Sequence, residues 1–265
     1  MNTLRMITVT MFLLSKSVNA LAQNETVEEY PSAREVVPHV VASLKNISNG
    51  FEFRYHVSNK ETALQNIWQF LVEVKTEGSN NITPQDWRVS IIERPNIRAA
   101  SWGSRDSNRD IAPGDSLSGF GLSSTGLPGI VKYFARGYLE PPEGEIDFKE
   151  GTNDIFYNSV KGTTIGPVDP PSPFVALDFL DTIISYKHQS FDLGWIDNQG
   201  VVNSLDAKLD NAKKQLERDN KTAAINQLEA FVNEVEAQKD KHLSNEAYAL
   251  LKFNAEYLIK KLSEP

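Results

Sequence analysis

The chain of 265 residues contains no cysteine. This absence excludes disulfide bonds, a catalytic thiolate, zinc sites built on thiolates and a lipid-modified N-terminal cysteine. Basic residues are also in the minority, because 27 lysines and arginines stand against 35 aspartates and glutamates and leave a net charge of −8. An acidic surface favours neither the phosphate backbone of nucleic acids nor an anionic membrane surface. We therefore expect no nucleic-acid partner.

Long apolar runs are missing after the first residues of the chain. Arg5 precedes the nine-residue apolar segment Met6–Leu14, and Ala20–Ala22 places small residues where a signal peptidase reads them. Nine apolar residues cannot cross a bilayer, which takes about 20. We predict a signal peptide at residues 1–22, and a secreted or periplasmic protein with no membrane insertion after cleavage. Cleavage would change the net charge from −8 to −10, because it removes Arg5 and Lys16.

Residues 38–165 show the period of two that is typical of strands with one buried face. Large apolar residues alternate with more polar ones at Phe51, Phe53, Tyr55 and Val57, and again at Trp68, Phe70, Val72 and Val74. Further strands are expected near Trp87–Ile92, Ile97–Trp102, Leu117–Leu122, Ile130–Leu139 and Val160–Ile165. Short strands separated by frequent turn signals predict an antiparallel, immunoglobulin-like β-sandwich.

The second half of the chain changes to helical periodicity. We interpret the proline-rich residues 166–171 as a semi-rigid linker and residues 172–263 as an antiparallel helical bundle. Ser172 and Pro173 are expected to open the first helix, and Ser244 to cap the last. The linker should separate two folding units, so residues 172–265 should form a bundle by themselves. The predicted fold class is thus all-β plus all-α in two domains.

Two apolar stripes identify the central pair of helices. They comprise Val202, Leu205, Leu209, Ala212 and Leu216, and then Ile225, Leu228, Phe231, Val232 and Val235. The chain must reverse between the stripes, and we expect Asn220 to adopt the left-handed backbone there.

The stripes, together with the turn Gly194–Val201 and the later Ala247, Leu250, Ala255 and Leu258, resemble the FIMAH-type helical module of bacterial secreted proteins. The resemblance covers about residues 173–262 and implies export and a helper role, with no catalytic residues. The family tends to have glycine in the two later turns, where Asn220 and Asp240 stand here. The N-terminal half loosely resembles uncharacterised Ig-like bacterial domains.

Motifs that carry catalysis or bind metals are missing. The four histidines, His39, His56, His188 and His242, are far apart in sequence, and no nucleophile motif such as GxSxG accompanies them. The acidic segment from Glu143 to Asp154 lacks the spacing of an EF-hand calcium loop, so we interpret it as a solvated loop. We predict no catalytic residue, no metal and no cofactor.

The four tryptophans are the remaining candidates for a binding site. We assign Trp68 to the core and Trp195 to the end of the bundle. Trp87 and Trp102 flank the turn at Pro95. Exposed aromatic rings often bind sugars or partner proteins, so these two are the candidate ligand-binding residues, with core packing as the alternative.

Two functions are compatible with these observations. The first is an exported, non-catalytic binding protein whose ligand is a polysaccharide or an envelope protein. The alternative is a secreted glycan-active hydrolase, or an accessory subunit of one, with paired carboxyl groups on a concave face of the sandwich.

Overall fold

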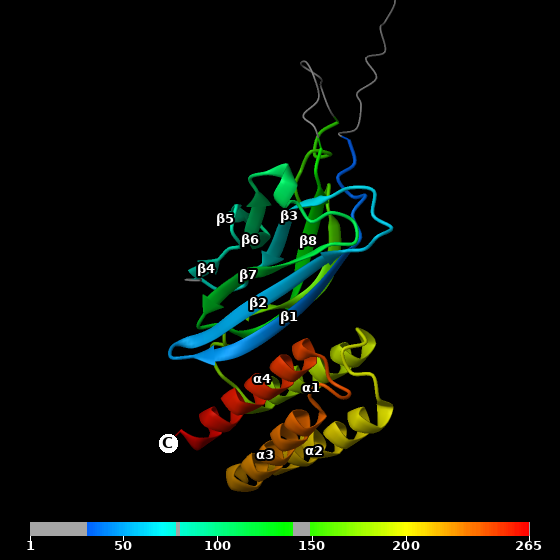
Figure 1. The fold of residues 1–265 in the computed structure, drawn as a ribbon. Helices are drawn as coiled ribbons and strands as arrows, with labels where there is room; N and C mark the ends of the chain where they lie inside the picture. Colours follow the sequence, from blue (N-terminus) through cyan, green and yellow to red (C-terminus); the bar gives the residue numbers. More distant parts are fainter. Residues whose placement is uncertain (1–30, 78–79, 140–148, 265) are drawn as a thin grey trace, which may run out of the picture.

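The computed structural model describes residues 31–77, 80–139 and 149–264. Two antiparallel sheets come first along the chain, and four helices follow (Figure 1). The fold class predicted from the sequence is therefore confirmed. The predicted signal peptide and the segment 140–148, which includes Glu143, lie outside the described residues.

The first sheet has the strand order β1-β2-β7-β4, and the second has the order β5-β6-β3-β8-β9. The strands are β1 (Pro38–Ile47), β2 (Gly50–Asn59), β3 (Ile67–Glu73), β4 (Asn80–Ile82), β5 (Trp87–Arg94), β6 (Ile97–Ser104), β7 (Ser116–Ser124), β8 (Leu127–Gly137) and β9 (Val160–Val168), with a short 3-10 helix η1 (Ser107–Arg109) after β6. Neighbouring strands pair antiparallel throughout both sheets. The strands β1 and β9 are each at an edge of their sheet.

Aromatic rings fill the space between the two sheets. Phe70 of β3 stacks on Trp102 of β6, with ring centroids 5.8 Å apart, and Phe120 of β7 contacts both rings from the opposite sheet. Tyr55 of β2 is also buried, and its hydroxyl donates a hydrogen bond of 3.1 Å to the Ile165 carbonyl oxygen. Its polar atom is thus satisfied inside the core.

The predicted linker is shorter in the structure. Residues 166–168 belong to β9 and pair with residues 127–129 of β8, so only residues after Val168 connect the sheet to the first helix. Proline is tolerated in this position because β9 is an edge strand, where a missing N–H need not break a ladder on the outer side. Composition alone did not distinguish such a strand from a proline-rich spacer.

Four helices follow: α1 (Ala176–Asp192), α2 (Gln199–Glu217), α3 (Lys221–Gln238) and α4 (Asn245–Ser263). Sequence neighbours pack against each other, and α1 also packs against α4, which closes the bundle around one apolar core. Ser244 accepts a hydrogen bond from the Ala247 backbone N–H, so its predicted role as the cap of α4 is confirmed. In the described part of the chain no helix combines the length and apolarity that crossing a membrane requires.

The start of the first helix differs from the prediction. Helix α1 begins at Ala176 and not at Pro173, and its cap position is held by Val175, which makes no side-chain cap. The ring of Phe174 packs against Phe179 and Tyr257, with centroids 5.8 and 5.9 Å away. We attribute the later start to this packing, which holds the preceding residues outside the helix.

The reversal between α2 and α3 is one residue earlier than predicted. Asp219, with φ of 56°, is the left-handed residue, whereas Asn220 has φ of −93°. The N–H of Asp219 bonds to Leu216 O and that of Asn220 to Gln215 O, which is the Schellman pattern of helix ends. Asn220 instead caps α3 by accepting a bond from the Ala223 N–H. The other expected stand-in for glycine, Asp240, does have a positive φ of 59°.

Helix α4 attaches the bundle to the sandwich. It packs against β1, β8 and β9, and Figure 1 shows α1 and α4 between the sheets and the outer pair α2 and α3. Ala249, Leu250 and Phe253 of α4 belong to the same buried cluster as the sandwich core. The buried Glu246 accepts a hydrogen bond from the backbone N–H of Ala42 in β1, and Asn254 Nδ2 donates one of 2.8 Å to Pro128 O. The helix therefore covers sheet edges that would otherwise expose unpaired backbone groups.

Candidate functional site

The outer face of the second sheet carries a polar row that runs across four strands. The pairing register places Arg88 of β5 opposite Gly103 of β6, Gly103 opposite Gln69 of β3, and Gln69 opposite Arg136 of β8. Residues directly opposite in antiparallel strands point to the same face. Two guanidinium groups thus stand at the ends of a row whose middle contains a glycine and an amide.

A depression of about 460 Å³ lies over this row. Its lining includes Trp68, Gln69, Arg88, Ser101, Gly103 and Arg105, together with two further serines and no aspartate or glutamate. The hollow exists because its centre carries small side chains or none. An added Cβ at Gly103 would meet only the Trp68 ring, at an ordinary 3.8 Å, so space does not require glycine there.

The floor of the depression is a connected set of polar groups. Gln69 Nε2 donates to Ser101 Oγ at 2.9 Å, and Arg136 Nη1 donates to Gln69 Oε1 at 3.2 Å. The guanidinium of Arg136 also lies over the Trp68 ring, 5.9 Å from its centroid. Gln69 and Ser101 are buried, so these bonds satisfy their polar atoms and fix the shape of the floor.

The two arginines of the depression differ from Arg136 in having no such contacts. Among the residues that the structure describes, no acidic side chain pairs with Arg88 or Arg105. Both are exposed. Arg88 lies on β5, and Arg105 directly follows β6, where its N–H bonds to Asp86 O. Both guanidinium groups can therefore accept a ligand of opposite sign.

The candidate ligand-binding residues taken from the sequence, Trp87 and Trp102, are inside the core. They are 3 % and 0 % exposed, and their indole N–H groups donate to Arg109 O and Ile82 O. An exposed platform built from these rings is therefore excluded, and the prediction is corrected to core packing. The physical reason is the strand period of two, which turns both rings inward and turns Arg88 outward.

The residues of the depression were missed by sequence reasoning, although a signal for them exists. Applying the same alternation to Trp87–Ile92 and Ile97–Trp102 places Arg88 and Ser90, and Ser101 and Gly103, on one outer face. Trp68, assigned to the core from the sequence, is only half-buried and lines the depression. A register shift between Ile67 and Gln69 interrupts the regular alternation at this point.

A second hollow, of about 720 Å³, lies where the sandwich meets the bundle. It contains His39 and His242, but His242 Nδ1 is 2.7 Å from Asp197 Oδ1, and Glu246 is bonded to the first sheet. Burial raises the pKa of the Tyr133 hydroxyl beside it. No group of three or more potential metal ligands occurs within residues 31–77, 80–139 and 149–264. His242 and Glu246 thus already have partners within the molecule.

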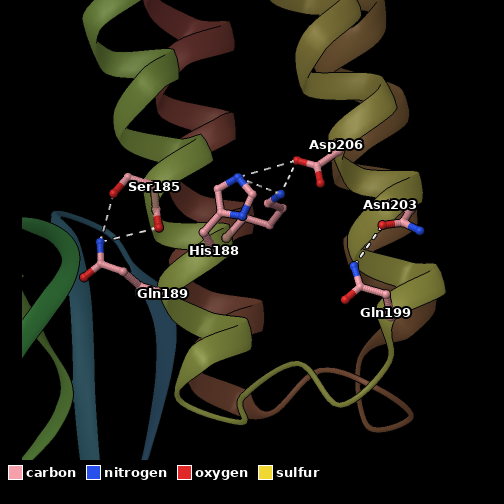
Figure 2. A network of polar contacts seen from close by, with 7 residues as sticks. Ser185, His188, Gln189, Gln199, Asn203 and Asp206 are labelled. Atoms are coloured by element: carbon pink, nitrogen blue, oxygen red, sulfur yellow. Dashed lines mark hydrogen bonds and ion pairs between the residues drawn. The ribbon is translucent and has the colours of Figure 1, made fainter.

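A buried cation joins α1 to α2. The ammonium group of Lys187, from α1, donates a hydrogen bond to Asp206 of α2. Figure 2 shows His188 of α1 directed at the same carboxylate. The Lys187 side chain is fully buried, and its Nζ lies 3.2 Å from His188 Nε2. The flanking contacts Ser185–Gln189 and Gln199–Asn203 each stay within one helix. A buried charge needs a partner of opposite sign. We therefore interpret this network as a structural contact between α1 and α2.

Comparison with known proteins gives a family model and a solved structure that each match part of the chain. No curated protein matches it. A solved structure of an uncharacterised protein from Nocardia farcinica, described as an immunoglobulin-like fold, matches with 10% identity and a TM-score of 0.32, over 50% of this chain and 99% of that chain. Residues 185–260, from α1 to α4, match the family model of the FIMAH domain, the family that the helix stripes and the turn at Gly194 resemble.

Proposed function

We propose that this chain is an exported, non-catalytic binding protein of the surface or adhesion type, whose sandwich holds a polysaccharide or an envelope protein. The depression on the outer face of the second sheet carries the proposal, because it combines a fixed polar floor with exposed guanidinium groups that pair with no acidic side chain among the described residues. The FIMAH match supports a modular role for the bundle. Export rests on the apolar segment Met6–Leu14 and the triplet after it.

Binding is favoured over hydrolysis at this site. A glycoside hydrolase needs two carboxyl groups that flank the scissile bond. The lining of the depression includes no aspartate or glutamate, so this hollow lacks the acid and base that the reaction requires.

Retention on immobilised ligands tests the proposal. The chain beginning at Gln23 should be retained on cell-wall polysaccharides or on an envelope extract, and Gly103→Val should abolish retention. Valine suits a strand, and its Cβ would approach only the Trp68 ring, at 3.8 Å, so the variant should fold while its methyl groups project into the hollow.

Ser43→Val is the matched control, because Ser43 is an exposed residue of β1 in the other sheet. This variant should be retained like the unmodified chain. If no polysaccharide or extract retains the unmodified chain, or if Gly103→Val is retained equally well, the depression is not the binding site and the proposal fails.

A further inference from the structure

We propose that the depression binds a carboxylated polysaccharide in which acidic sugars alternate with neutral ones; this rests on the proposed function. The first observation is a local reversal of charge. The chain has a net charge of −8, yet the lining of the depression has two arginines and no acidic residue. A guanidinium group matches a carboxylate through two parallel hydrogen bonds, so a carboxylate is the complementary ligand group.

The number of arginines available to a ligand limits how densely charged that ligand can be. Arg136 is already engaged with Gln69 and the Trp68 ring, which leaves Arg88 and Arg105 for a ligand. The surrounding acidic chain repels a polymer with a charge every few ångströms, such as a nucleic acid. Spaced carboxylates avoid most of this repulsion.

The floor of the depression favours sugars over peptides. The exposed Ser90 hydroxyl can exchange hydrogen bonds with sugar hydroxyls, and the half-buried Trp68 ring adds an apolar surface to the same lining. Peptides, in contrast, are usually bound along a sheet edge or in an apolar groove. This hollow lies on the face of the sheet, and Trp68 is the only large apolar side chain in its lining.

Affinity measurements with defined probes test the inference on the chain beginning at Gln23. Hyaluronan oligosaccharides serve as the alternating carboxylated glycan, chitin oligosaccharides as the neutral glycan, poly-L-glutamate as the acidic peptide and single-stranded DNA as the dense polyanion. We expect binding to hyaluronan that weakens as salt is added, and no binding to the other three. Arg88→Glu and Arg105→Glu should each lower the affinity about tenfold or more, as expected for a lost charge-assisted contact.

Arg94→Glu is the matched control, because Arg94 is an exposed arginine at the end of β5 and outside the depression. It changes the net charge equally and should leave the affinity unchanged. Tight binding of the chitin oligosaccharides that Gly103→Val abolishes and Arg88→Glu does not would overturn the anionic ligand while leaving the proposed function intact. Binding of poly-L-glutamate or DNA in preference to hyaluronan, or an equal loss with Arg94→Glu, would also overturn the inference. Binding to none of the probes contradicts it as well.

Discussion

At the scale of single residues, the turn between α2 and α3 separates two roles that asparagine and aspartate can both fill. Asp219 closes α2 in the left-handed conformation, and Asn220 opens α3 with its side chain. Both residue types tolerate positive φ and both can cap a helix, so the sequence left their order open. The Schellman hydrogen bonds to Gln215 and Leu216 decide the order, because they require the left-handed residue directly before Asn220.

Substitutions in this turn should distinguish the two roles. Asp219→Gly is expected to be neutral or slightly stabilising, because glycine adopts positive φ without strain. Asp219→Val should cost about 1 kcal/mol or more, because a β-branched residue fits positive φ poorly. Asn220→Ala should cost about 1 kcal/mol through the lost cap. Denaturant unfolding measures these changes, and a tolerated Asp219→Val combined with a stabilising Asn220→Gly would reverse the assignment.

The buried pair of Lys187 and Asp206 gives a second prediction for single residues. Asp206→Ala leaves the ammonium group buried without its partner and should cost about 2 kcal/mol or more, somewhat less than a fully buried pair because the Asp206 side chain is 33% exposed. Lys187→Met keeps the length of the side chain and removes the charge, so it should be close to neutral. Chemical unfolding of both variants checks this, and a large loss with Lys187→Met alone would show that the charge itself stabilises the bundle.

At the scale of secondary structure elements, α4 packs against both the bundle and the sandwich. Its stripe must serve the bundle, yet Ala249, Leu250 and Phe253 also complete the sandwich core. A single apolar stripe predicts only one partner surface, so the sequence pattern identified the helix and its membership of the bundle but not its second contact. Glu246 is the clearest sign of this position, because it is a buried carboxylate in the first turn that binds another element.

Glu246 should therefore couple the helix to the edge of the first sheet. Glu246→Ala is expected to cost about 2 kcal/mol, because it leaves the Ala42 N–H buried without an acceptor. Glu246→Gln keeps an acceptor oxygen and should cost less, losing the favourable charge at the helix N-terminus. Amide hydrogen exchange at Ala42 provides the specific readout. Unchanged protection of this amide in Glu246→Ala would mean that the contact does not hold the strand.

At the scale of the whole molecule, the shared core argues against two independent folding units. The sequence predicted that residues 172–265 fold alone, but that fragment would expose the side chains of α4 that the sandwich buries. Exposure of apolar surface that is normally covered costs stability. We now expect the isolated fragment to melt at a lower temperature than the bundle does in the full chain.

Leu250→Ala tests the coupling in the full chain. Leu250 is fully buried in the cluster that joins α4 to the sandwich, so truncation should cost about 3 kcal/mol. Far-UV circular dichroism follows the helices, and tryptophan fluorescence is dominated by the sandwich, which holds Trp68, Trp87 and Trp102. The two signals should shift together and by the same amount. Separate transitions, with only the helical signal affected, would restore the picture of two independent domains.

The sequence by itself determined the elements whose signals are local. The period of two predicted the strands, and the apolar stripes predicted the helices and carried the FIMAH resemblance. Ser244 indicated the start of α4. These features depend on backbone geometry over a few residues, which the nearby sequence encodes directly. The same alternation predicts that the Trp87 and Trp102 side chains point inward, when it is applied to β5 and β6, which contain them.

Only the tertiary structure decided which surfaces meet. The registers of β5, β6, β3 and β8 bring Arg88, Gly103, Gln69 and Arg136 into one row from segments far apart in the chain. The docking of α4 covers β1 and β9. Pairing with β8 continues β9 through Gly166 and Pro167, where composition had indicated a linker. Strand register and helix docking depend on the packing of many side chains that are far apart in the sequence, so a pattern over a few neighbouring residues cannot predict them.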